Sequence, residues 1–444
     1  MNTPVTPKLP NRDLRAPRQK RPGANSGNAA WRASRVGAPA LVFILFMLPM
    51  TNAELTSSLL VLFVGVAVAA YRADFRSVWI AFSVPWLLIL GMSALDLSYL
   101  SRDISTTTMA VIVVGLLACL ALCPPLRFAT APLERSPVNG RRFLACFALF
   151  MGISVLNVAL AGYVPLIQGF MTGESGYYDF GVKGVYGLYN AYANAFGVMC
   201  FYFWMRDGSR RYQIGFLCVT AAFLLFVTRQ NLISLVVECF IVFNLVVRRT
   251  SRLTLVTGVF GVLVVFSIVG NFRTGADISE LADIRAQWKW LPDSILWLYS
   301  YSYFNLLNLD NVVTAYPAPE LNGLSITQLL PSFLRVAEVD DIGLLEVGNF
   351  GVTSYASPIF RDFGFVGIAA TIGAFSLWAE RLLAVRLRSP FASVTSYSVI
   401  YFCFAMSFFI NFWFFLPVIF QLFFFWAFGK WLFSPPRSDT SRTN

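Results

Sequence analysis

The sequence predicts an all-α polytopic membrane protein with about twelve transmembrane helices. Of its 444 residues, 57% are hydrophobic, 16% are aromatic and 13% are charged, which lies outside the usual range of soluble globular proteins. Apolar runs of about 20 residues, the length that spans a bilayer, recur along the chain. Lys and Arg cluster between these runs, so the net charge of +11 indicates membrane topology and not a nucleic-acid partner.

The predicted elements follow in order along the chain. Residues 1–36 are rich in Pro, Arg and Asn, carry no cleavable signal, and are expected to form a disordered basic cytoplasmic tail. Transmembrane helices one to nine are predicted within 37–270, a long loop over 271–360, the last three helices within 361–433, and a second tail over 434–444. The predicted helices cover 37–53, 55–71, 76–93, 106–123, 142–163, 185–205, 212–228, 230–247, 253–270, 362–383, 392–410 and 412–433. The first two are short and tightly joined, so about eleven helices is the alternative.

The distribution of Lys and Arg predicts that both termini are cytoplasmic. With that orientation most of the 34 cations lie on the inner side, as the positive-inside rule requires. The 271–360 loop, and a smaller loop over 164–184, then face outward. Loops as long as the first are usually functional or disordered, and its aromatic, Pro and Gly content favours an ordered loop.

Cysteine and histidine usage narrows the chemistry. All seven cysteines fall in apolar segments, where a thiol behaves as a small hydrophobic group, so we expect no disulfide framework and no zinc site. Histidine is absent, which removes the commonest general base and metal ligand. We therefore expect no metal and no cofactor, and proton transfer by a carboxylate, Lys, Tyr or the substrate itself.

The cations predicted on the outer side are exceptions to the charge bias: Arg102, Lys183, Arg229, Arg273, Arg285, Lys289, Arg335 and Arg361. Arg229, Arg273 and Arg361 lie where a predicted helix meets the outer surface. Guanidinium groups bind phosphate bidentately and remain charged, so a diphosphate at that depth would suit them. Alternatively, they reach lipid headgroups or pair with nearby acids, as Arg361 could with Asp362.

Carboxylates gather in the same predicted loop. The run VAEVDDIGLLEVGN contains Glu338, Asp340, Asp341 and Glu346, and Asp310 and Asp362 lie nearby in the sequence. Without histidine, a carboxylate is the expected base for a sugar hydroxyl. The run could instead bind a divalent cation, although it lacks the spacing of a calcium loop, or it could be solvated surface.

Aromatic residues crowd the stretch WKWLPDSILWLYSYSYFNLLNLDN. The alternation of Tyr299, Tyr301 and Tyr303 argues against a helix throughout, whereas Trp290, Trp297 and Phe304 are spaced to share a helix face. Tyr and Trp favour the membrane interface. They could also line a groove in which sugar rings stack.

Glu238 lies within the predicted helix 230–247. An acid at that depth is a functional hypothesis by default. It could pair with an arginine facing the bundle interior, or it could be protonated and structural.

Two stretches resemble a known family. TRQNLISLVV places Arg229 at an outer helix start, and a second group of residues closes the large loop: Asn349, Thr353, Tyr355, Arg361, Asp362, Phe363, Gly364 and Gly367. With the many-helix architecture, these resemble the Wzy-type oligosaccharide repeat-unit polymerases, which make O-antigen and exopolysaccharide in the bacterial inner membrane. The Arg-x10-Gly loop motif of some members is not met by Arg273, Arg335 or Arg361.

The resemblance implies a GT-C-like glycosyltransferase architecture with one large periplasmic loop. It also implies an undecaprenyl-diphosphate-linked glycan as substrate, transfer at the periplasmic face, contact with membrane lipids and a chain-length regulator as partner. The catalytic residues expected are Asp362, Arg361 and Arg229, and the substrate-binding residues are Arg273, Asn349, Tyr355, Tyr301, Tyr303 and Trp297.

Three alternatives to a polymerase stay open. They are a lipid-linked glycan flippase or other transporter, an O-antigen ligase-like transferase and a non-catalytic assembly component. The ligase branch of the family relies on a periplasmic histidine, which this sequence lacks.

Overall fold

The computed structural model describes residues 74–93, 95–122, 131–134, 136–173, 176–182, 184–247, 277–327, 329–330, 334, 345, 350–386 and 389–433. The predicted tails, the predicted helices 37–53, 55–71 and 253–270, and the acidic residues Glu338, Asp340, Asp341 and Glu346 lie outside these residues. Regular structure in the described residues is helical, apart from two isolated bridges that pair Ser98 with Ile284 and Val138 with Phe433.

Every predicted membrane helix that falls within the described residues is a helix. In chain order they are α3 (Val78–Ser93), α4 (Thr106–Leu122), α5 (Gly140–Ala161), α7 (Val185–Asp207), α8 (Arg210–Leu225), α9 (Arg229–Val246), α14 (Ala356–Val385), α15 (Pro390–Ala405) and α16 (Leu416–Trp431). A short helix, α6 (Pro165–Thr172), follows α5. In the described part of the chain, Gly140–Thr172, Arg229–Val246 and Ala356–Val385 are long and apolar enough to cross a membrane. These helices indicate a membrane protein.

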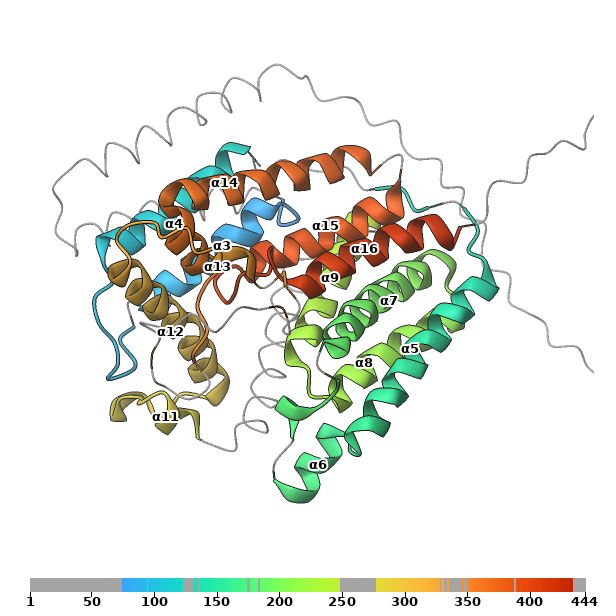
Figure 1. Ribbon diagram of the computed structural model, residues 1–444, viewed down its shortest axis with the longest axis horizontal. Coiled ribbons are helices and arrows are strands. Elements are labelled where there is room, and N and C mark those ends of the chain that lie inside the picture. Colours follow the sequence, from blue (N-terminus) through green and yellow to red (C-terminus); the bar gives the residue numbers. More distant parts are fainter. Residues whose placement is uncertain are drawn as a thin grey trace, which may run out of the picture. The chain divides into compact units, whose positions relative to one another are not determined.

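Helix α7 lies against α5, α8, α9 and α16, as the green and red helices of Figure 1 show. Small residues allow this close packing, because they let helix backbones approach one another. A Cβ atom added at Gly197 of α7 would lie 2.9 Å from side-chain atoms of both Val219 on α8 and Leu235 on α9. The absence of a side chain at Gly197 therefore lets α7 pack closely against both α8 and α9.

The segment predicted as a long outer loop contains helices of its own. They are α11 (Ile278–Leu281), α12 (Asp293–Ala315) and α13 (Leu324–Thr327). Helix α12 packs against α3, α4 and α14 (Figure 1). Most of its side chains are buried, so it is a component of the core and not a helix lying on the surface.

The reading of the Tyr299, Tyr301 and Tyr303 alternation as non-helical was wrong, because all three lie in α12. In a helix, residues four apart share a face, so Tyr299 and Tyr303 are in contact, with ring centroids 5.4 Å apart. Tyr301 points to another side and contacts Trp297 instead. Tyrosines on two different sides of this buried helix therefore gave an alternation in the sequence that looked like a strand pattern. Trp290 precedes α12 and is 72% exposed, so it does not share the buried face of Trp297 and Phe304.

Helix α14 is kinked near its start. Gly364 has φ 59° and ψ −150° within it, a conformation that is essentially open only to glycine. A Cβ atom there would lie 3.2 Å from Pro319 Cγ. Gly364 therefore allows the kink in α14. Its lack of a side chain also lets Pro319, in the segment 316–327, pack closely against the helix.

Candidate functional site

Arg229 is the first residue of α9 and is 9% exposed. A tight turn from α8 places it there, with Val227 in the left-handed region at φ 56°, an uncommon conformation for a β-branched residue. A cation at a helix N-terminus is disfavoured by the helix dipole. Its terminal Nη2 donates to the Tyr301 hydroxyl at 3.4 Å. This position is electrostatically unfavourable for an arginine unless it interacts with negative charge.

Aromatic rings surround the Tyr301 end of this pair. The Tyr301 ring stacks on Trp297 with a centroid distance of 5.5 Å, and it meets Phe350 at 5.2 Å and Phe409 at 5.6 Å. The rings come from α12, from the stretch before α14 and from the turn after α15. The structure thus brings together three residues that were predicted as site residues, Arg229, Tyr301 and Trp297.

Arg361 and Asp362 form a second group, with partners that the sequence did not suggest. Arg361 Nε donates to Glu320 Oε2 at 2.8 Å, and the guanidinium lies 3.9 Å from the centroid of the Tyr316 ring. The predicted alternative in which Arg361 pairs with Asp362 is not what the structure shows. The reason is geometric, since neighbouring residues on a helix point in different directions.

Asp362 is fully buried and accepts three hydrogen bonds. They come from the backbone N–H of Leu324 at 3.0 Å, the backbone N–H of Ser325 at 2.7 Å and the Ser325 hydroxyl at 2.6 Å. These donors lie at the start of α13. Together with the Arg361 and Glu320 ion pair, Asp362 fastens the segment 316–327 to the start of α14.

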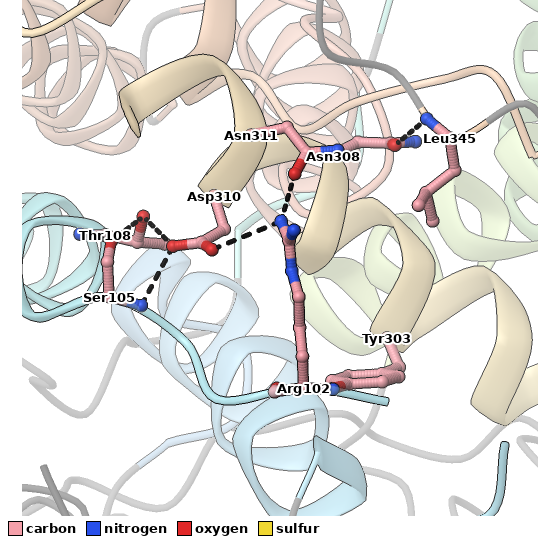
Figure 2. Close-up of polar contacts among 8 residues, drawn as sticks. All are labelled: Arg102, Ser105, Thr108, Tyr303, Asn308, Asp310, Asn311 and Leu345. Carbon is pink, nitrogen blue, oxygen red and sulfur yellow. Dashed lines mark hydrogen bonds and ion pairs between the residues drawn. The ribbon is translucent and has the colours of Figure 1, made fainter. Parts of the chain in front are cut away.

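Tyr303 belongs to a third group, at Asp310 (Figure 2). The Tyr303 hydroxyl accepts from the backbone N–H of Arg102 at 2.9 Å and donates to the Arg102 carbonyl at 2.8 Å, and burial raises its pKa. Asp310 accepts from the Ser105 N–H at 2.9 Å, from the Thr108 hydroxyl at 2.8 Å and from Arg102 Nη2 at 3.4 Å. This group ties α12 to the start of α4.

The remaining predicted site residues are separate from these groups or not described. Tyr355 is buried among Phe82, Trp86 and Trp413 at the start of α14, with ring centroids 5.8, 6.2 and 4.9 Å away. Arg273 and Asn349 lie outside the described residues.

Comparison of the chain with family models, curated proteins and solved structures yields no match. A function for this chain must therefore be inferred from its sequence and from the geometry of the site.

Three structural partners were missed by the sequence reasoning. Glu320 bonds to Arg361, Ser325 bonds to Asp362, and Arg102 bonds to Asp310. The partners are between 37 and 208 residues apart in the sequence. No local spacing signals such contacts. The one available signal was that Arg102 belongs to the cations predicted on the outer side.

Glu238 lies within α9 and is fully buried. The Ser234 hydroxyl donates to its Oε1 at 2.5 Å, and Gln421 Nε2 of α16 donates to its Oε2 at 2.7 Å. Of the two predicted alternatives, pairing with an arginine is not found among the described residues.

The three groups differ in what they can do chemically. Asp310 and Asp362 have their oxygens occupied by donors of the chain, so they serve as anchors. Arg229, with a hydroxyl and aromatic rings beside it, is suited to hold an anion that carries a sugar. In the part of the chain that the structure describes, no group of three or more His, Cys, Asp or Glu side chains could hold a metal.

Proposed function

We propose that this protein is a glycosyltransferase that polymerises undecaprenyl-diphosphate-linked oligosaccharide repeat units, in a bacterial inner membrane and at its periplasmic face. The observation that carries the proposal is the position of Arg229, largely buried at the start of an apolar helix and beside the Tyr301 hydroxyl. The guanidinium of Arg229 would bind the diphosphate headgroup through charge-assisted hydrogen bonds, and the adjoining aromatic rings would contact a sugar.

The reaction forms one bond and breaks one. A hydroxyl of the incoming repeat unit attacks the anomeric carbon of the growing chain, a new glycosidic C–O bond forms, and the C–O bond to the lipid diphosphate breaks. The diphosphate leaves with the electron pair, and the proton of the attacking hydroxyl passes to a base. Arg229 stabilises the developing negative charge electrostatically. The product polymer is O-antigen or exopolysaccharide.

Arg361 and Asp362 take positioning roles in this scheme. The Arg361 guanidinium is paired with Glu320, and the Asp362 oxygens are occupied by α13. Both side chains hold the segment 316–327 in place beside α12 and α14. For Asp362 to act as the base, a Ser325 donor would first have to release it, whereas anchoring needs no rearrangement.

The experiment is a polymerisation assay with purified protein in liposomes. The substrate is the lipid-linked repeat unit isolated from cells that lack this protein, and gel electrophoresis reports chain length. R229A is expected to lower the rate about 10²- to 10³-fold, the usual cost of losing one donor to a developing anion. R285A is the matched control, because Arg285 is also a predicted outer cation and its own neighbour is Asp96, at 2.9 Å. Wild-type chain growth by R229A would overturn the proposal.

A lipid-linked glycan flippase is the second candidate, because it would account for Glu238 and Gln421 buried within the bundle. The same liposomes separate the two functions. Movement of the glycolipid across the bilayer without new glycosidic bonds would select the flippase, and longer glycans would select the polymerase.

A further inference from the structure

Polar side chains form a line along one face of α9. Asn231, Ser234 and Glu238 are spaced by three and four residues, which places them one above another on a helix. From Asn231 to Glu238 the line covers about 10 Å along the axis, at 1.5 Å per residue. It leads from the N-terminal end of α9 to the middle of a helix that is long and apolar enough to span a membrane.

Helices α7 and α16 add polar groups to the same line. Asn194 of α7 donates to Asn231 Oδ1 at 3.4 Å, and Gln421 of α16 donates to Glu238. Asn194 is 5% exposed, and its Oδ1 has no hydrogen-bond partner among the described residues. One turn earlier on α7, Asn190 Oδ1 is also buried, and it has no partner in the part of the chain that the structure describes. Buried acceptors of this kind normally bind a donor, commonly a water molecule.

The described groups near Glu238 are uncharged side chains. Cys239 of α9 and Cys403 of α15 lie close to its carboxyl group, and Cys200 of α7 lies close to Cys239. Helix α16 presents Gln421, and α8 carries no charged residue after Arg211 near its start. No Lys or Arg pairs with Glu238 among the described residues. A buried carboxylate without a cation is costly, and binding a proton removes that cost.

The hydrogen bond between Ser234 and Glu238 fits both protonation states. The oxygen atoms are 2.5 Å apart. A hydroxyl is both donor and acceptor, so Ser234 can donate to the carboxylate or accept from the carboxylic acid at the same separation. Gln421 donates to the other oxygen in either state. The site can therefore gain or lose a proton without rearranging its neighbours.

We propose that Glu238 is a proton-binding site inside the helix bundle, and that its proton exchanges with solvent at the N-terminal end of α9 through Asn231, Asn194 and Asn190. The path requires donors, supplied by water, at the two unpartnered amide oxygens. This site is independent of glycan transfer at Arg229, and it would remain if the proposed function were wrong.

Infrared spectroscopy of the full chain in liposomes tests the site. A protonated carboxyl group has its own C=O stretching band, which shifts when its proton is replaced by deuterium. We expect a band that disappears reversibly as pH rises, is absent in E238Q and is retained at a shifted position in E238D. The absence of a band at every pH, or a band that neither titrates nor exchanges in the folded protein, would overturn the site.

The exchange path is tested by the rate of the deuterium shift after transfer to D₂O. N194L is expected to slow this shift at least about tenfold, because a Leu side chain of similar volume cannot bind water. N157L is the matched control, because Asn157 is also a buried helix residue but bonds to Ile153 of its own helix, α5. Equal exchange rates in N194L and the wild type would overturn the path, and circular dichroism checks that each variant is folded.

Discussion

Asp362 and Ser325 are joined by two hydrogen bonds, one from the Ser325 backbone and one from its hydroxyl, at 2.7 and 2.6 Å. The two residues belong to different helices, α14 and α13. Asp362 thus occupies the position that a capping side chain usually holds at a helix start. Asp362 is buried and its neighbour Arg361 is partly buried, and both have partners in the segment 316–327, which neutralise Arg361 and satisfy Asp362.

Asp362 is expected to act as an anchor. D362A removes the acceptor for three donors, so we expect a loss of about 2–3 kcal/mol in the free energy of unfolding, measured by SDS unfolding in mixed micelles. S325A is expected to cost about 1 kcal/mol, since one hydroxyl bond is lost. The outcome that would make Asp362 the base is a D362N variant that is as stable as S325A but does not polymerise, while S325A does.

Gly364 is expected to tolerate no side chain. G364A forces a non-glycine residue to φ 59° and brings its Cβ to 3.2 Å from Pro319, so a loss of about 1–3 kcal/mol is expected. The control is G152A in α5, where nothing lies within 4 Å of the added Cβ. There the higher helix propensity of alanine should stabilise by about 0.5–1 kcal/mol. A neutral G364A would show that the kink is not required.

Asp310 and Arg102 are expected to contribute unequally, although they form an ion pair. Asp310 is 7% exposed in its side chain and Arg102 is 49% exposed. D310A leaves the donors of Ser105, just before α4, and Thr108, in its first turn, without their acceptor and should cost about 2–3 kcal/mol. R102A removes a largely solvated charge and should cost less than about 1 kcal/mol. Equal losses in SDS unfolding would contradict this reading of Figure 2.

Tyr301 and Tyr303 offer a matched pair for function. The Tyr301 hydroxyl contacts Arg229, whereas the Tyr303 hydroxyl is bonded to the Arg102 backbone. Y301F should lower the polymerisation rate about 3- to 10-fold, the effect of one hydrogen bond of roughly 0.5–1.5 kcal/mol. Y303F should lower stability by a similar free energy and leave the rate per folded molecule unchanged. The reverse pattern would place the site at Arg102.

Helix positions were predictable from the sequence because the signal is local. A run such as FLACFALFMGISVLNVALAG needs only its own residues to be recognised, and α5 is found over Gly140–Ala161. Helix α12 was not recognised as core, because its polar residues are satisfied by parts of the chain that are distant in the sequence. Asn308, for example, donates to the backbone carbonyls of Phe350 and Val352 and accepts from the Leu345 N–H.

The candidate site was predictable only in its residue types. Arg229, Tyr301 and Trp297 were named from charge and aromatic character, and the fold places them together. Arg361 and Asp362 were named by the same reasoning, yet their side chains form hydrogen bonds with Glu320 and Ser325 of the chain itself. Charge at a membrane boundary indicates that a partner is needed, but it does not indicate whether the partner is a ligand or the chain itself.

The sequence by itself determined the class of protein, the positions of the apolar helices and the presence of costly charges near and within them. These follow from composition and from the length of hydrocarbon that each helix must cross. Only the tertiary structure decided which charged side chains have hydrogen-bond partners and which residues those partners are, as for Asp362, Asp310 and Glu238. Hydrogen bonds act over about 3 Å, so partners distant in the sequence become visible only when the chain is folded.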